Sequence, residues 1–329
     1  MAKQGILLLA LGQPHYGNYA ANLAMSIKFN LPDMPIALLH DDTAIRHISG
    51  DKRIEVFDQL IQVPKEFYQV DGEDRFIRTK NFLYSLSPFD ETLFLDADII
   101  LFPNVADSVG KLISELAEVD FSVSSRGYHE LDKLSDKTYS QWVNIEDVKK
   151  AYGIKKGKYY GLHSEFIWFK KTAKNDKFFS LVESITSDFD SYKVITQDRS
   201  VHHSAVSIIN EVEVCRAVFG GGTPDELPYA IAMAKMKYYP HKDNFTPIYW
   251  EVADNNRLIH KVKDLYSQYI GLSWGGNRTP SETTKLYNLL VKFYTGKGGY
   301  KYFPLIAKDR KSTRLNSSHA ITSRMPSSA

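Results

Sequence analysis

The chain is poor in cysteine and in net charge. Cys215 is the single cysteine among 329 residues. This excludes a disulfide within the chain and is typical of a reducing compartment, so we expect a cytoplasmic protein. The 41 lysine and arginine residues against 39 aspartate and glutamate residues leave a net charge of +2. So small an excess gives no electrostatic case for binding nucleic acid.

Long hydrophobic runs are also missing. The run Ile6-Leu-Leu-Leu-Ala-Leu11 follows Lys3, but it is too short to span a membrane, and Gly12-Gln-Pro-His15 is a poor cleavage region. We interpret the run as a buried first strand and expect no transmembrane segment. Hydrophobic residues make up 43% of the chain, which is ample for a core, and the length suits one large domain or one and a half.

The end of the chain does not read as part of a domain. Asp309-Arg-Lys-Ser-Thr-Arg-Leu-Asn-Ser-Ser-His319 resembles a translated sequencing-library adapter, and Ser323-Arg-Met-Pro-Ser-Ser-Ala329 resembles the next adapter block in a shifted frame. We therefore expect residues 309–329 to be a non-native, disordered tail and leave them out of the fold prediction. A natural disordered tail rich in serine and arginine is the alternative.

The most informative stretch is Phe94-Leu-Asp-Ala-Asp-Ile-Ile-Leu-Phe102, where Asp96 and Asp98 lie one residue apart between two apolar runs. Residues 92–95 have the composition of a buried strand. Because unpaired buried charge is very costly, two carboxylates at the end of such a strand indicate a partner, and a divalent metal suits their oxygens best. A metal there can hold a diphosphate and stabilise a leaving nucleotide. A surface turn carrying two acids is the alternative.

Strand and helix signals alternate through the first half of the chain, as in a βαβ sheet that binds ligands at the carboxyl ends of its strands. The predicted strands cover residues 5–11, 35–40, 55–63, 92–95, 119–124, 165–170, 248–252 and 257–262. The predicted helices cover residues 18–29 with Asn18 as N-cap, 77–86, 145–152 and 176–189. Residues 128–160 are polar and weakly patterned apart from the one helix, which indicates an insertion.

One further helix is predicted after the loop Gly220-Gly-Gly-Thr-Pro-Asp-Glu226. Thr223 suits the N-cap, Pro224 the first helical position, and Asp225 and Glu226 the first turn. A helix N-terminus beneath a glycine loop is a good place for acids that face an acceptor. Alternatively, both acids only complement the helix dipole.

Three blocks together resemble the glycogenin-like glycosyltransferases, also called glycosyltransferase family 8. They are Leu9–Tyr16 with the following small-residue segment Ala20–Ile27, Arg78-Thr-Lys80, and Asp96-Ala-Asp98. The match covers roughly the first hundred residues well and the rest patchily. It implies an α/β, Rossmann-like GT-A fold with a mixed, mostly parallel sheet flanked by helices. Residues 1–265 would form this domain, with 128–160 as an acceptor-side insertion and 266–308 as a helical extension packed on it.

The resemblance also implies the donor site. Gly12, Tyr16 and Ala97 would contact the nucleotide, with Tyr16 stacked on the base. Lys80 would lie near the donor phosphates and take part in catalysis. The donor would be a nucleotide-diphosphate sugar, with a UDP-sugar favoured.

The metal site implied by the resemblance holds Mn²⁺ or Mg²⁺ between Asp96, Asp98 and a later histidine. His260 is the favoured candidate for that histidine and His241 the runner-up. An imidazole among oxygen ligands suits manganese.

The implied reaction is hexosyl transfer, with retention, to a hydroxyl of a glycan, a lipid-linked acceptor or a protein. The acceptor would approach near Glu165, Asp225 and Glu226. Gln197-Asp198 is a second candidate for the family's Asp-Gln pair, which Asp225-Glu226 would otherwise match. If one of these acids is a well-placed base, inversion is the alternative.

The chain departs from the family in two blocks. Leu162-His-Ser-Glu165 stands where members usually have Asn-small-Gly, which puts the donor sugar in question. The family's Lys-Pro-Trp signature is absent, and Ser273-Trp-Gly-Gly276 replaces it only loosely.

Three other functions are weighed against the transferase. A sugar nucleotidyltransferase would carry a basic, glycine-rich loop after its first strand, which Gly12–Tyr16 lacks. A phosphatase or phosphotransferase using Asp96 as nucleophile would place this motif at its first strand. A non-catalytic sugar-binding protein on the same fold would not need Lys80 and both aspartates.

Overall fold

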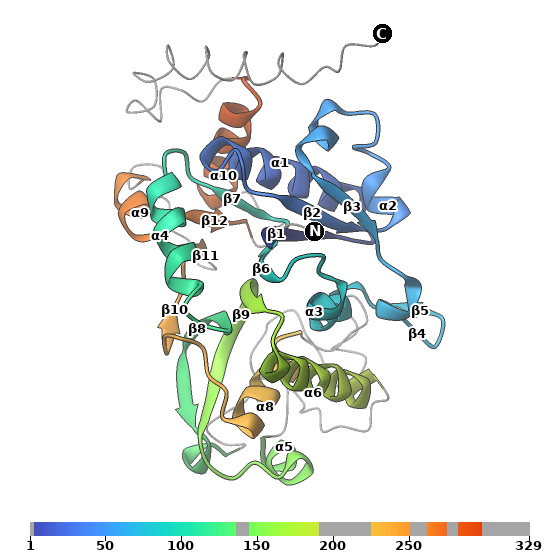
Figure 1. The fold of residues 1–329 in the computed structure, drawn as a ribbon, viewed down its shortest axis with the longest axis vertical. Coiled ribbons are helices and arrows are strands. Elements are labelled where there is room, and N and C mark those ends of the chain that lie inside the picture. The colour runs from blue at the N-terminus through green and yellow to red at the C-terminus, as the bar shows by residue number, and fades with distance from the viewer. Residues whose placement is uncertain (1–2, 136–144, 191–224, 251–261, 275–281, 298–329) are drawn as a thin grey trace.

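A mixed sheet of seven strands, in the order β10-β8-β9-β6-β1-β2-β3, organises the computed structural model of this chain (Figure 1). The structure describes residues 3–135, 145–190, 225–250, 262–274 and 282–297. The strands are β1 (Gln4–Ala10), β2 (Ile36–His40), β3 (Gln59–Gln62), β6 (Glu91–Asp96), β8 (Phe121–Glu130), β9 (Lys158–Lys170) and β10 (Asn244–Phe245).

The directions of these strands confirm the predicted fold class, a mixed and mostly parallel α/β sheet flanked by helices. β3, β2, β1 and β6 pair in parallel. β9 is antiparallel to both β6 and β8, so β8 runs in the same direction as the parallel four. β10 pairs antiparallel with β8 at the edge.

Helices cover both faces of the sheet (Figure 1). One buried cluster includes side chains of α1, α4, α9 and α10, and the other includes side chains of α3, α5, α6 and α8. The helices are α1 (Pro14–Asn30), α2 (Asp42–Ile45), α3 (Leu83–Leu86), α4 (Ala106–Leu116), α5 (Ile145–Tyr152), α6 (Ala173–Asp190), α8 (Glu226–Met236), α9 (Val262–Gln268) and α10 (Glu282–Tyr294). Short 3₁₀ segments are η1 (Lys52–Val56), η2 (Lys65–Phe67), η3 (Phe76–Phe82) and η4 (Leu131–Lys133).

The central strand β1 explains why its sequence is apolar at every position. Ile6 and Leu8 belong to the cluster on one face, whereas Leu7 and Leu9 belong to the cluster on the other. A strand covered on both faces has no solvent side, so it shows no polar alternation. The predicted first strand is therefore confirmed. Among the described residues, no helix has both the length and the apolar character needed to cross a membrane.

A second, three-stranded sheet lies beside the end of β6. It consists of β7 (Ile99–Leu101), β12 (Gly271–Ser273) and β11 (Ile248–Trp250), with β12 in the middle. β12 runs antiparallel to β7 and parallel to β11. This pairing brings residues from near the end of the chain next to the turn that follows β6. A separate hairpin joins β4 (Gln69–Val70) and β5 (Glu73–Asp74).

Several predicted boundaries are wrong. Helix α1 begins at Pro14 instead of after Asn18, because proline is preorganised for the first helical position. The Asn18 side chain accepts a hydrogen bond from Arg53 Nη2 at 2.8 Å instead of capping the helix. The first part of the predicted helix 77–86 is the 3₁₀ segment η3. Strand β9 begins at Lys158 instead of Glu165.

The early start of β9 also changes the interpretation of residues 128–160 as an insertion. Tyr128 at the end of β8 pairs with Tyr160 near the start of β9, so both ends of the predicted insertion belong to the main sheet. Tyrosines pair well across strands, and this long-range pairing is invisible in a local pattern. Of the predicted strand 257–262, residues 257–261 lie outside the described residues, and Val262 begins α9.

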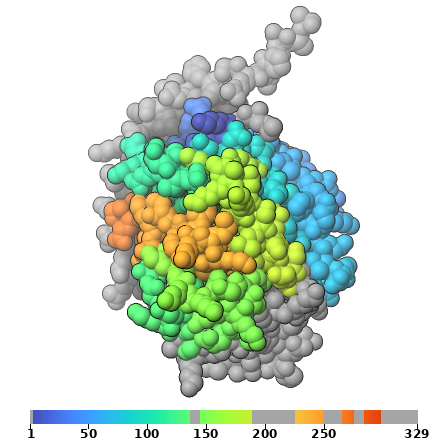
Figure 2. All heavy atoms as spheres, turned by 60° about the horizontal axis from the view of Figure 1, so that its bottom comes forward, coloured from blue at the N-terminus to red at the C-terminus, as the bar shows by residue number. Residues whose placement is uncertain are grey.

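Segments far apart in the chain meet on the face of α8. α8 packs against α6, β9 and α5, and Figure 2 shows its part of the chain (orange) among the green and yellow-green segments of the middle of the sequence. The first turn of this helix is thereby brought to the carboxyl end of β6.

Replacement by alanine of two glycines inside helices is expected to change the stability of the protein in opposite directions. A Cβ on Gly17 in α1 would lie 2.1 Å from the backbone oxygen of Ala44, whereas a Cβ on Gly110 in α4 meets nothing within 4 Å. Overpacking against backbone typically costs about 1–3 kcal/mol, so Gly17→Ala is expected to lower the free energy of unfolding by that amount. Gly110→Ala is expected to raise it by up to about 1 kcal/mol, since alanine favours helix. Urea titrations of both variants test this, and equal effects would contradict the close packing of α1 on α2.

Candidate functional site

The two predicted metal-binding carboxylates follow the strand β6. Leu93 and Leu95 point into one core and Phe94 into the other, so the strand is buried up to Asp96, whose side chain is 27% exposed. The amide of Ala97 donates to Asp96 Oδ1 at 3.2 Å and closes the turn that carries Asp98. Burial and the charge of Asp96 raise the pKa of Asp98 to about 7. Two carboxylates this close together repel each other, and a nearby positive charge relieves that repulsion.

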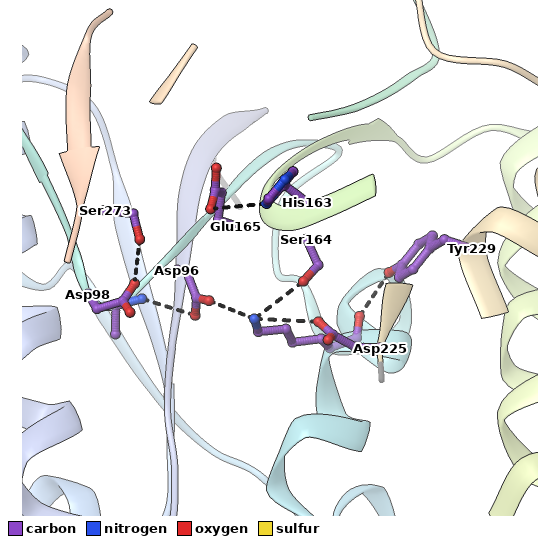
Figure 3. Close-up of polar contacts among 10 residues, drawn as sticks. Asp96, Asp98, His163, Ser164, Glu165, Asp225, Tyr229 and Ser273 are labelled. Carbon is purple, nitrogen blue, oxygen red and sulfur yellow. Dashed lines mark hydrogen bonds and ion pairs between the residues drawn. The ribbon is translucent and has the colours of Figure 1, made fainter. Parts of the chain in front are cut away.

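Asp96, Ser164 and Asp225, which are labelled in Figure 3, converge on the ammonium group of Lys80. Its Nζ donates to Asp96 Oδ2 at 2.6 Å and to Ser164 Oγ at 3.5 Å, and it lies 3.4 Å from Asp225 Oδ2. Burial alone would lower the pKa of Lys80, but the carboxylates of Asp225 and Asp96 outweigh burial and hold the pKa well above its usual value. The ammonium group therefore stays charged. The predicted role of Lys80 at the donor phosphates stays a prediction, and its side chain lies beside Asp96 at the end of β6.

The start of α8 supplies Asp225, the second carboxylate that pairs with Lys80. Asp225 precedes the helix at the N-cap position, but its side chain makes no capping hydrogen bond and contacts Lys80 instead. Asp225 is 5% exposed, and within the described part of the chain its Oδ2 has no hydrogen bond. Burial and Asp225 raise the pKa of Glu226 well above its usual value. Thr223 and Pro224, predicted to cap this helix, lie outside the described residues, as do Gln197 and Asp198.

A hydroxyl of the same helix holds the backbone of Lys80. Tyr229, one turn into α8, donates from its hydroxyl to the carbonyl oxygen of Lys80 at 2.8 Å. Tyr229 is fully buried. The contact ties α8 to the segment that carries Lys80. Nothing in the local sequence marks Tyr229 or Ser164 as part of a site, and both were missed.

Glu165 reaches the site through an irregularity in β9. The ladder between β8 and β9 shifts register, so that Ile167 faces Val123 but His163 faces Ser124. The intervening residues, including Glu165, are left out of regular pairing, as in β-bulges that re-aim side chains near sites. Glu165 is buried, and its Oε2 lies 3.9 Å from His163 Nδ1. Residues 162–165, where the sequence departs from the family pattern, are thus part of the site.

A hollow of 270 Å³ adjoins the carboxylates at Glu165. It is lined by hydrogen-bonding side chains and by two tyrosines, Tyr249 and Tyr269, whose ring centroids are 5.2 Å apart. Aromatic faces and polar groups are the usual lining of sites for small polar ligands. The lining residues are Arg126, His163, Glu165, Asn244, Thr246, Ile248, Tyr249 and Tyr269.

The buried carboxyl of Glu165 predicts a pH-dependent stability. Burial, with Asp98 and Asp96 adding, raises its pKa from 4.5 to about 8. The folded protein therefore binds a proton more tightly than the unfolded chain, and stability falls as pH rises from about 4.5 through about 8. Glu165→Gln is expected to remove this loss of stability. Its free energy of unfolding should exceed that of the unsubstituted protein by a few kcal/mol at pH 9 and by nothing at pH 4.

Urea unfolding in EDTA at pH 4, 6, 7.5 and 9 measures the effect. If the free energies of unfolding of the two proteins differed by the same amount at every pH, a raised pKa at Glu165 would be contradicted. The charged and titratable groups that act on this carboxyl are Asp98, Asp96, Lys80, Arg126 and His163.

The predicted nucleotide-contacting residues lie at the carboxyl end of β1. Gly12 has φ +79°, and a Cβ there would lie 2.3 Å from the Phe76 ring, so only glycine fits. Its amide donates to Asp41 Oδ2 at 3.0 Å. Tyr16 in the first turn of α1 is 38% exposed and is therefore accessible to a flat ring. Ala97 is buried and contributes backbone to the turn.

Of the two histidines predicted as metal ligands, the structure describes only His241. His260 lies outside the described residues. His241 Nδ1 lies 2.8 Å from Ser122 Oγ, and Ser122 is in register with Trp168, which in turn faces Leu93 well before the end of β6. No described contact joins His241 to the two aspartates. Among the residues that the structure describes, no group of three or more His, Cys, Asp or Glu side chains is arranged to hold a metal.

A serine stands beside Asp98 instead. Ser273 Oγ lies 3.4 Å from Asp98 Oδ1, and the Trp274 amide donates to the Asp98 carbonyl at 3.1 Å. The sequence singled out Ser273-Trp274 only as a loose stand-in for Lys-Pro-Trp. Its contact with Asp98 depends on the pairing of β12 with β7.

No protein-family model and no curated protein sequence matches the chain. Similar solved structures include the apo form of the bifunctional glycosyltransferase WbbM, with 11% identity and a TM-score of 0.49 over 92% of this chain and 51% of that one. This chain thus spans about half of WbbM. The galactosyltransferase LgtC with donor and acceptor sugar analogues has 11% identity and a TM-score of 0.46, covering 89% and 100%. Mouse xyloside xylosyltransferase 1 has 9% identity and a TM-score of 0.45, covering 84% and 99%.

Proposed function

We propose that this protein is a metal-dependent glycosyltransferase of GT-A fold. It moves a sugar from a nucleotide-diphosphate sugar, with UDP-sugars favoured, to a hydroxyl acceptor. One observation carries the proposal: the charged Lys80 pairs with Asp96 and with the buried Asp225 at the carboxyl end of β6, two residues before Asp98. Ligands bind at this edge of open α/β sheets.

The residues present fit a divalent cation. Asp96 and Asp98 are oxygen donors at an open strand end, and the raised pKa of Asp98 indicates negative charge that a cation would relieve. A cation bound there would supply electrostatic stabilisation of the leaving nucleoside diphosphate. Asp96 and Asp98 would hold it, and Mn²⁺ or Mg²⁺ suits such ligands.

Lys80 and Asp225 are suited to the phosphate and the sugar of the donor. Lys80 is a fixed cation between two acids and needs little rearrangement to stabilise developing negative charge on a phosphate oxygen. Asp225 Oδ2 is a buried acceptor that is paired with Lys80 Nζ at 3.4 Å and has room for a shorter hydrogen bond. A buried acceptor of this kind is costly unless a donor reaches it, and a sugar hydroxyl is such a donor.

The hollow beside Glu165 is suited to the acceptor. Its tyrosines and polar side chains match the faces and hydroxyls of a sugar ring. A glycan, a lipid-linked sugar or a glycosylated protein would present such a ring. Retention at the anomeric carbon belongs to the proposal through the family resemblance.

The experiment that tests the function measures release of nucleoside diphosphate by the full chain from a panel of UDP- and GDP-sugars. Each donor is assayed with Mn²⁺, with Mg²⁺ and with EDTA. Release from one donor that depends on the metal would support the transferase and identify its donor. Absence of release together with absence of metal-dependent nucleotide binding would overturn it and favour a scaffold role.

A further inference from the structure

The described structure places the hydroxyl of Ser273 beside the carboxylate of Asp98. Ser273 is 3% exposed, and its Oγ lies 3.4 Å from Asp98 Oδ1 (Figure 3). The serine is the last residue of β12 and pairs with Ile99, the residue directly after Asp98. The Trp274 amide, which donates to the Asp98 carbonyl, fixes the same two segments a second time. The hydroxyl is therefore held in place by two backbones.

The hydrogen bond from Ser273 Oγ to Asp98 Oδ1 is long, so both oxygens keep the freedom to turn toward a shared cation. A hydrogen bond between a hydroxyl and a carboxylate is normally about 2.5–3.0 Å long, shorter than the 3.4 Å observed. Two oxygens at right angles around a cation at about 2.1 Å, the distance typical of Mg²⁺, lie about 3.0 Å apart, so a shift of about 0.4 Å would let both bind one such ion. Serine and threonine hydroxyls bind Mg²⁺ in phosphate sites.

We infer that Ser273 supplies the third protein oxygen of the metal site, so that the site consists of Asp96, Asp98 and a hydroxyl. The inference rests on the proposed function, because it assumes that the aspartates hold a metal. Its consequence is that the ligands supplied by the described part of the chain are all oxygens. Oxygen ligands suit Mg²⁺ and Mn²⁺, whereas an imidazole shifts preference toward Mn²⁺, Co²⁺ and Zn²⁺.

The first test measures Mn²⁺ binding to the full chain in the presence of UDP by electron paramagnetic resonance. Ser273→Ala is expected to weaken Mn²⁺ binding about tenfold, and Ser273→Thr, which keeps the hydroxyl, to stay within about threefold of the unsubstituted protein. Ser122→Ala is the matched control, because Ser122 is also a fully buried strand serine but bonds to His241. It is expected to leave Mn²⁺ binding unchanged. Thermal unfolding of each variant checks that the fold is kept.

The second test measures metal preference by competition of Mg²⁺ against bound Mn²⁺. Ser273→His is expected to raise the preference for Mn²⁺ over Mg²⁺ by at least about tenfold. His260→Gln and His241→Gln are expected to change neither binding nor preference.

The outcomes separate this inference from the proposed function. Mn²⁺ binding that is equal in Ser273→Ala and the unsubstituted protein would overturn the inference and leave the metal-dependent transferase standing. Binding lost in His260→Gln but kept in Ser273→Ala would overturn it in favour of the histidine. No Mn²⁺ binding by the unsubstituted protein would overturn both.

Discussion

Asp98→Asn is expected to lower metal-dependent release of nucleoside diphosphate about a thousandfold. A cation at an enzyme's reacting centre contributes several kcal/mol of charge stabilisation, and each 1.36 kcal/mol is tenfold in rate. Asparagine keeps the shape of the side chain but removes the charge that binds the metal. The amide also removes repulsion with Asp96, the interaction that adds to burial in raising the pKa of Asp98. Stability at neutral pH should therefore be kept or increased.

The combination of lost activity and kept stability is the distinguishing result. Release of nucleoside diphosphate from the donor found in the panel is measured with saturating Mn²⁺, beside urea unfolding of the same samples. Asp107→Asn, an exposed acid in the first turn of α4, is the control and should leave release unchanged. Asp98→Asn with undiminished Mn²⁺-dependent release would rule out the carboxylate pair as the metal site.

Lys80→Met is expected to have the second large effect, on both stability and activity. Its ammonium group pairs with Asp96 and with the nearly fully buried Asp225. Removing one partner of a buried pair typically costs about 3–5 kcal/mol, because the other charge is left uncompensated. Release should also fall about a hundredfold or more, as for other preorganised groups that stabilise developing charge.

A double variant separates the two effects. Lys80→Met combined with Asp225→Asn removes the orphaned charge, so much of the stability should return while release stays low. Lys28→Met is the matched control, because Lys28 pairs with Asp58 at 2.9 Å near the surface, where such a pair is worth about 1 kcal/mol or less. Unfolding by urea and release assays are run on all four proteins. If the double variant regained activity, Lys80 would have only a structural role.

Strands, helix ends and site residues differ in how well the sequence predicted them. Strand β1 and the run before Asp96 were predictable because each is apolar on both faces, a pattern that few elements other than a buried strand share. The start of α1 was missed because Pro14 outweighed the capping signal of Asn18. The length of β9 was missed because it depends on pairing with β8, which lies more than twenty residues earlier in the chain.

For the site, the sequence determined that Asp96 and Asp98 follow a buried strand and that Lys80 and Asp225 are available charges. Spacing along the chain carries this much, because a strand places its own residues. Only the tertiary structure decided that Asp225 contacts Lys80 instead of capping its helix, that a bulge directs Glu165 toward the carboxylates, and that β12 brings Ser273 to Asp98. These contacts join segments far apart in the sequence. They form because burying both faces of the sheet fixes where α8 and β12 pack, and no local pattern contains that information.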